Sequence, residues 1–167
     1  MALEASFKID GVDEHAEIER GEDLDIVIAG GGLAGLALAL ALQERNTEAH
    51  VFETQQSIRS YTATAIGIGS NGLTALEGIK PGLSSIIAQA GTYTTSLKFI
   101  LVRDGKEDPP RITQVPQNQF ITVRWQSVHE ILASLVDKNR VVFSHKLVGY
   151  RPCKVCTVFL YFKILCG

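Results

Sequence analysis

Four residues between positions 30 and 53 have the types and spacing needed to hold a dinucleotide. Gly30, Gly32 and Gly35 follow an apolar segment, and Glu53 lies 23 residues after Gly30. In the dinucleotide-binding fingerprint the first glycine permits a tight turn, the second lets the backbone approach a pyrophosphate, and the third lets a helix pack close to a sheet. The helix N-terminus then offers N–H groups to the phosphates, and the carboxylate accepts hydrogen bonds from a ribose. The sequence therefore predicts a phosphate-binding turn.

The segments around these glycines agree with the fingerprint over residues 25–53. An apolar strand is predicted at 26–29, a helix of small and apolar residues follows, and a second strand ends at Glu53. Asn46 falls where the helix must stop, and asparagine readily takes the left-handed conformation that ends helices. A βαβ unit is therefore predicted, rather than a chance match of glycines.

The apolar run at 26–42 raises the alternative of a membrane-spanning helix. It has 17 residues without a polar side chain, which is near the lower limit for a span. Three successive glycines would weaken such a helix, because each costs about 1 kcal/mol relative to alanine. Asp23 and Asp25 flank the run, where a signal peptide would have basic residues. We predict no membrane span, no signal peptide and an intracellular, cytoplasmic location.

The overall composition is that of one globular domain. The chain has 167 residues, of which 46% are hydrophobic and 20% charged. The net charge of −2, without a basic cluster, gives no indication of nucleic-acid binding. Residues 1–23 hold eight acidic and two basic side chains, a net of −6, which leaves +4 for residues 24–167. We predict an acidic flexible tail at 1–23 and a body suited to an anionic ligand.

Three cysteines lie close to the C-terminal end of the sequence. Cys153 and Cys156 have CxxC spacing, and Cys166 follows. A zinc site needs a second pair of ligands, and the sequence supplies none at useful spacing. We predict no metal site, and the odd number of cysteines favours a reducing compartment.

Beyond Glu53 the pattern predicts a second group of elements. They are a loop at 54–65, a short strand at 66–69, a helix capped by Ser70 and Asn71, a short helix at 83–90, a hairpin turning at Asp104-Gly105 with strands near 97–101 and 112–115, an amphipathic helix at 125–136 and a strand at 140–144. The alternation of Leu97, Phe99 and Leu101 with Lys98, Ile100 and Val102 predicts a strand with one better-buried face. The last strand is expected to rejoin the parallel sheet.

Four stretches resemble the single-component FAD-dependent monooxygenases, the p-hydroxybenzoate hydroxylase-like family of hydroxylases and epoxidases. They are the βαβ unit with VFE at 51–53, Arg59 in the next loop, AIGIGSNGLTALEGI at 65–79, and ITVRWQSVHEILASLV at 121–136, which is similar to an R-x-x-L-x-x-x-L helix of the family. The resemblance implies an α/β fold: a Rossmann-like FAD/NAD(P)-binding fold with a parallel sheet and βαβ unit, incomplete, with the start of a second small β-sheet.

The same resemblance implies FAD as cofactor, with NAD(P)H as co-substrate in the hydroxylation or epoxidation of an organic substrate. The cofactor-binding residues it implies are Gly30, Gly32, Leu33, Ala34, Gly35, Glu53, Thr54, Arg59 and Arg124. Arg124 precedes a helix, whose dipole is unfavourable to a cation there, so an anionic partner would explain it. A solvated surface arginine is the alternative. The four histidines are scattered, each is interpreted as structural or solvated, and no catalytic residue is predicted.

The resemblance ends near Tyr150, and residues 151–167 contain neither the Asp-Gly nor the Gly-Asp motif that the family carries later in its sequence. We predict an N-terminal part of an FAD-binding domain at 24–150, with 93–118 as a hairpin insertion toward a substrate domain, and an unrelated or aberrant tail at 151–167. The expectation is a truncated chain without monooxygenase activity. The alternatives are an NAD(P)-dependent Rossmann oxidoreductase and a non-catalytic nucleotide-binding module. The sequence leaves open the substrate, the oligomeric state and whether the chain is itself an enzyme.

Overall fold

A three-stranded parallel sheet carries the glycine-rich turn. The computed structural model describes residues 24–58, 64–152 and 158–165. The βαβ unit consists of β1 (Val27–Ala29), α1 (Leu33–Gln43) and β2 (His50–Phe52). The strand β10 (Val141–Val142) joins β2 in parallel, which gives the order β1-β2-β10. The predicted α/β fold is confirmed, and so is the return of the chain to the parallel sheet.

The apolar run at 26–42 is divided between β1 and α1, and α1 has 11 residues. Over the part of the chain that the structure describes, no helix has the length and apolar character needed to cross a bilayer. The helix ends as predicted near Asn46, which has a φ of 54°. Its apolar sequence is explained by contacts with the parallel sheet on one side and with another helix on the other.

A second, antiparallel sheet follows the βαβ unit, in the order β3-β9-β4. Its strands are β3 (Ala65–Gly69), β4 (Gly91–Tyr93) and β9 (Phe120–Arg124). Two helices, α2 (Ser70–Ile79) and α3 (Leu83–Gln89), connect β3 to β4. The predicted cap of α2 is wrong, because Gly69 is the N-cap and no side chain caps the helix. Gly69 pairs with Phe120 in the sheet, so the strand runs directly into the helix and Ser70 is already helical.

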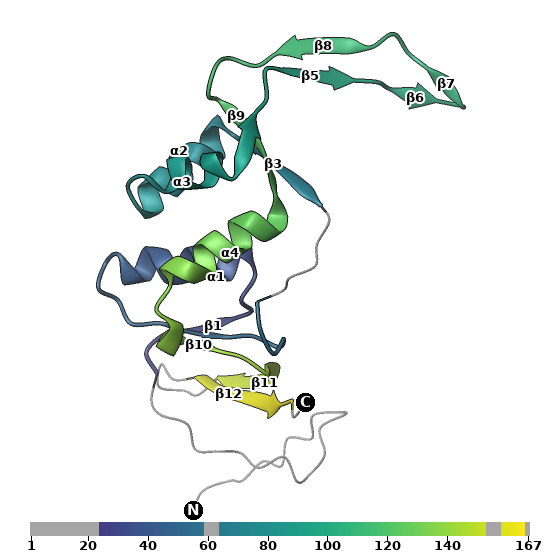
Figure 1. Ribbon diagram of the computed structural model, residues 1–167. Coiled ribbons are helices and arrows are strands. Elements are labelled where there is room, and N and C mark those ends of the chain that lie inside the picture. The colour runs from purple at the N-terminus through teal and green to yellow at the C-terminus, as the bar shows by residue number, and fades with distance from the viewer. Residues whose placement is uncertain (1–23, 59–63, 153–157, 166–167) are drawn as a thin grey trace, which may run out of the picture.

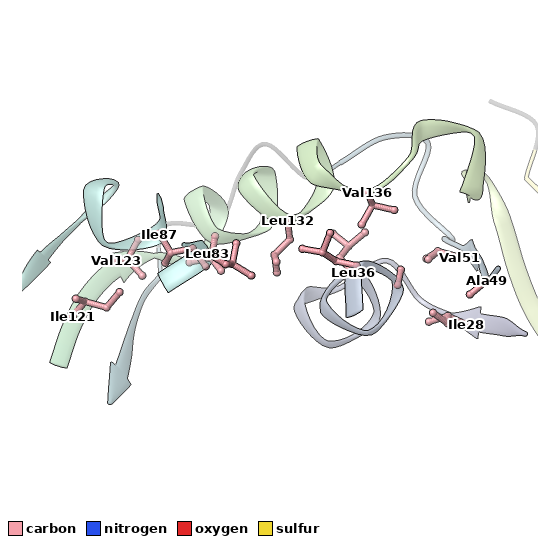
Figure 2. Packing of buried hydrophobic residues seen from close by; sticks show 13 residues of the cluster. Ile28, Leu36, Ala49, Val51, Leu83, Ile87, Ile121, Val123, Leu132 and Val136 are labelled. Atoms are coloured by element: carbon pink, nitrogen blue, oxygen red, sulfur yellow. The ribbon is translucent and has the colours of Figure 1, made fainter. Parts of the chain in front are cut away.

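The helix α4 (Trp125–Leu135) joins the two sheets and confirms the predicted amphipathic helix. It follows β9 without an intervening residue and lies alongside α1 (Figure 1). Its buried residues Val128 and Leu132 belong to the hydrophobic core. Leu132 and Leu36 point toward one another between the two helices (Figure 2). The short 3-10 helix η1 (Lys138–Arg140) then leads to β10.

A long β-ribbon projects away from the helices (Figure 1). It consists of β5 (Ser96–Phe99), β6 (Val102–Arg103), β7 (Lys106–Glu107) and β8 (Arg111–Gln114). The turn at Asp104-Gly105 is confirmed, with positive φ at both residues. The prediction of a better-buried face is wrong, because Phe99 is 57% and Leu101 52% exposed, and Leu97 alone of the three is half-buried. Over the described residues, the strands of the ribbon pair only with one another.

The described chain closes with an antiparallel hairpin beside the parallel sheet. It consists of β11 (His145–Pro152) and β12 (Val158–Ile164). The Phe162 ring of β12 stacks on the Phe52 ring of β2, with centroids 4.3 Å apart. The predictions for residues 1–23, Cys153, Cys156 and Cys166 concern positions outside the described residues.

Candidate nucleotide-binding site

The glycine turn has the backbone geometry that the fingerprint requires. Gly30 has a φ of 104°, a backbone conformation that residues other than glycine rarely adopt. Its N–H donates to the Phe52 carbonyl at 2.8 Å, which ties the turn to β2. A Cβ atom on Gly35 would collide with the Gly30 carbonyl oxygen, whereas one on Gly32 would meet no atom within 4 Å. Gly35 thus serves close packing, and Gly32 leaves open space beside the turn.

The first turn of α1 begins next to Gly32 and has N–H groups that no carbonyl of the helix accepts. Gly32 is its N-cap, and Leu36 is the first residue to return a hydrogen bond, to the Gly32 carbonyl at 3.0 Å. The N–H groups of Leu33, Ala34 and Gly35 therefore lack partners within the helix. The first turn contains no acidic side chain. These N–H groups and the positive end of the helix dipole can bind an anion.

Glu53 lies at the carboxyl end of β2 beside the turn. Its Oε2 accepts a hydrogen bond from the Gly31 N–H at 2.7 Å, and its Oε1 accepts one from the Gln55 N–H at 2.8 Å. The Glu53 backbone is fixed as well, because its N–H donates to the Val142 carbonyl at 2.8 Å. An ionised carboxylate has about four lone-pair sites, so Glu53 retains capacity for two further donors.

A cavity of about 170 Å³ lies between the turn, the following loop and α4. Its walls are Gly31 and Gly32 of the turn, Glu53, Gln55, Ser57 and Ile58 of the loop, and Trp125 and His129 of α4. Pockets for drug-sized ligands typically have volumes of about 300–1,000 Å³. The cavity therefore suits one part of a dinucleotide.

His129 and Trp125 form the wall that sequence reasoning missed. His129 is only 3% exposed, and its Nε2 lies 2.6 Å from the Gly31 carbonyl oxygen. A carbonyl can only accept, so Nε2 carries the proton, and among the described residues the buried Nδ1 has no hydrogen-bond partner. The centroids of the Trp125 and His129 rings lie 4.5 Å apart. Their four-residue spacing at the start of an amphipathic helix was the available signal, because it places both on one face.

Arg124 does not line the cavity. It is exposed, as the last residue of β9 and the N-cap of α4. The buried apolar positions of α4 explain the difference. Val128 and Leu132 lie three and seven residues after Trp125, so the first position of R-x-x-L-x-x-x-L falls on Trp125. The aromatic ring of this chain occupies the place where the family pattern has an arginine.

Of the predicted cofactor contacts, Gly32 and Glu53 are among the lining residues of the cavity, whereas Gly30, Leu33, Ala34 and Gly35 belong to the adjoining turn and helix. Thr54 is half-buried and follows Glu53, but it is not among the lining residues. Arg59 lies outside the described residues. Among the residues that are described, no group of three or more histidine, cysteine, aspartate or glutamate side chains is placed to hold a metal ion.

Comparisons with known proteins show what this site is similar to. Residues 25–82 match the model of the FAD binding domain family. "Monooxygenase 1" of Arabidopsis thaliana is 37% identical over 133 residues, which cover 80% of this chain and 32% of that protein. An "FAD-dependent monooxygenase" of Gibberella moniliformis is 36% identical over 146 residues, covering 79% of this chain and 33% of that protein. The chain thus spans about a third of the length of these relatives.

Solved structures confirm the fold. The 2,6-dihydroxypyridine-3-hydroxylase from Arthrobacter nicotinovorans superposes with a TM-score of 0.62 at 22% identity, over 82% of this chain and 32% of that one. The 2-methyl-3-hydroxypyridine-5-carboxylic acid oxygenase superposes with a TM-score of 0.58 at 21% identity, over 84% of this chain and 38% of that one. The predicted resemblance and the prediction of FAD as cofactor are confirmed together by these matches and the family match.

Proposed function

We propose that the glycine turn and Glu53 hold the ADP half of FAD. The premise is that this chain is related to the FAD-dependent monooxygenases and carries part of their FAD-binding domain. The observation that carries the proposal is the open space at Gly32. There Gly32, the N-cap of α1, directly follows Gly31, whose N–H donates to the Glu53 carboxylate.

Each group has a separate role in this binding. The N–H groups of Leu33, Ala34 and Gly35 donate to the pyrophosphate oxygens, which bring the negative charge that a helix N-terminus favours. Glu53 accepts from the ribose hydroxyls while Gly31 and Gln55 hold its carboxylate in place. Gly32 admits the phosphates to the backbone because it has no side chain to exclude them.

The α4 wall supports the other side of the cavity. Trp125 offers an aromatic face, and His129 fixes the Gly31 carbonyl. The unpartnered Nδ1 of His129 can accept a hydrogen bond, and a hydroxyl of the ligand is a group that would satisfy it. Thr54, Arg59 and Arg124 remain proposed contacts with the parts of FAD beyond this cavity.

The bound FAD would serve a monooxygenase reaction with NAD(P)H as electron donor and O₂ as oxidant. The cofactor supplies the redox and oxygen chemistry, and the protein supplies position and electrostatics. The residues of this chain bind and orient the nucleotide end of the cofactor. The substrate would be a small organic molecule.

The remaining predictions extend this proposal. Residues 24–150 would be the N-terminal part of the FAD-binding domain, between an acidic flexible tail at 1–23 and a segment at 151–167 whose sequence is unrelated to the family or aberrant. The ribbon within 93–118 would lie toward a substrate domain, which its exposed Phe99 and Ile112 support. A reducing, cytoplasmic location is proposed from the odd number of cysteines.

Flavin extraction and titration of the purified chain test the proposal. We expect visible flavin absorption after reconstitution and saturable quenching of FAD fluorescence, with ADP as a competitor. A protein that gains thermal stability from NAD(P)H and not from FAD would instead support the NAD(P)-dependent oxidoreductase. A protein that responds to ADP alone would support a non-catalytic nucleotide-binding module.

A further inference from the structure

We propose that the last strand, β12, positions the nucleotide site, and that Phe162 is the residue through which it does so. The inference rests on the proposed function in one respect, because the site that Phe162 positions is the one assigned to FAD. Phe162 does not line the cavity, and it acts through the β2 residues that hold the turn.

Phe162 holds the ring of Phe52 in place. The two rings are stacked, with centroids 4.3 Å apart and planes inclined by 23°. The His145 ring packs edge-on against the same Phe52 ring at 5.7 Å. Phe52 is thus fixed by two aromatic side chains of the β11–β12 hairpin.

The backbone of Phe52 and Glu53 controls both the start of the turn and its carboxylate. The Phe52 carbonyl accepts the hydrogen bond from the Gly30 N–H at 2.8 Å. The Glu53 carbonyl accepts from the His145 N–H at 2.9 Å, and its carboxylate accepts from the Gly31 N–H at 2.7 Å. A shift of Phe52 would therefore move the partners of two successive glycine amides.

Backbone hydrogen bonds join β12 to the same loop. Its last paired residue, Ile164, faces His145. The Leu165 N–H then donates to the Ser144 carbonyl at 2.8 Å, and the Ser144 N–H donates to the Gln55 carbonyl at 2.9 Å. The hairpin lies against the parallel sheet at this point (Figure 1). Phe162 is held firmly enough to transmit its position to the residues around Glu53.

The contact is separate from the main core. Phe52 and Phe162 are both half-buried, and neither belongs to the cluster of buried residues between the helices and sheets. Removal of the Phe162 ring should therefore loosen the turn locally and leave the core packed. This separation makes the inference testable on a folded protein.

The experiment compares Phe162→Ala with Phe162→Tyr, which keeps the ring, and with Tyr150→Ala on the neighbouring strand, where the side chain is 67% exposed. Hydrogen exchange of the Gly30 and Gly31 amides is measured by NMR on the ligand-free chain. An aromatic pair is worth a factor of about three to ten, so Phe162→Ala should accelerate both amides by that factor. Phe162→Tyr and Tyr150→Ala should stay within about twofold of the original chain.

FAD titration supplies the second measurement. Phe162→Ala should weaken binding by about three- to tenfold, because the Gly30 amide and Glu53 both depend on the position of Phe52. Unchanged exchange at Gly30 and Gly31 in folded Phe162→Ala would overturn the inference, as would an unchanged FAD affinity of this variant in a chain that binds FAD. If Phe162→Ala does not fold, Phe162→Leu is judged by the same two criteria.

The two proposals fail in different ways. A wild-type chain that does not bind FAD would refute the proposed function, whereas the exchange measurement would still decide whether Phe162 positions the turn. A chain that binds FAD, with exchange indifferent to Phe162, would leave the function standing and refute the positioning.

Discussion

The substitution Gly35→Ala separates helix propensity from packing at the nucleotide turn. Alanine is favoured over glycine within a helix by about 1 kcal/mol, so propensity alone predicts stabilisation. In the structure, however, the added Cβ would overlap the Gly30 carbonyl oxygen and lie 3.3 Å from Cγ2 of Ile28. Overpacking against such fixed atoms costs about 1–3 kcal/mol, and a backbone atom cannot rotate away as a side chain does.

We therefore expect Gly35→Ala to lower the free energy of unfolding by up to about 2 kcal/mol net. For a chain of this size this corresponds to a fall in Tm of up to roughly 8 °C. FAD affinity should fall as well, because relief of the clash displaces Gly30 and the start of α1. Urea unfolding followed by circular dichroism measures the first effect, and flavin titration measures the second.

Gly78→Ala is the matched control. Gly78 lies in α2, and a Cβ there would meet no atom within 4 Å. It should stabilise the chain by about 0.5–1 kcal/mol and leave FAD binding unchanged. If Gly35→Ala stabilised the protein as much as Gly78→Ala does, the close approach of α1 to Gly30 would be refuted.

Three further substitutions test the site and its surroundings. Glu53→Gln should weaken FAD binding by about tenfold or more, because hydrogen bonds to a charged group are worth about 1.5–3 kcal/mol, and unchanged affinity in a titration would contradict the ribose role. His129→Asn should lower the free energy of unfolding by about 2 kcal/mol, since it leaves the Gly31 carbonyl unpaired, whereas His129→Gln keeps a donor near Nε2 and should lose less in the same urea assay. Lys80→Met removes the partly exposed ion pair with Glu44 and should change stability by less than about 1 kcal/mol, so a larger loss would show a role beyond that pair.

The βαβ unit could be predicted from sequence because its determinants are local. All of them lie within residues 26–46: the apolar strand, the three spaced glycines and the asparagine that ends the helix. Each has a conformational requirement of its own. The hairpin turn at Asp104-Gly105 was predictable for the same reason. The predicted buried face of that hairpin failed, because burial depends on what else packs there.

The α4 wall of the cavity could not be derived in the same way. His129 is 98 residues from Gly31, so their hydrogen bond follows from the packing of α4 on α1 and not from any local motif. The sequence predicted a cofactor contact at Arg124, whereas Trp125, one residue later, lines the cavity. The difference arises because the buried apolar face of α4, and not the charge of Arg124, decides which residues face the cavity. The contact of Phe162 with Phe52 likewise requires β12 to pair with β11, which composition near the C-terminal end does not reveal.

The direct passage of β9 into α4 has a mechanical consequence. With no loop between them, a twist of the antiparallel sheet must rotate the first two turns of α4, and the second of these carries the His129 imidazole bonded to the Gly31 carbonyl. A displacement of the antiparallel sheet would thus be transmitted through α4 to the backbone of Gly31 in the glycine turn.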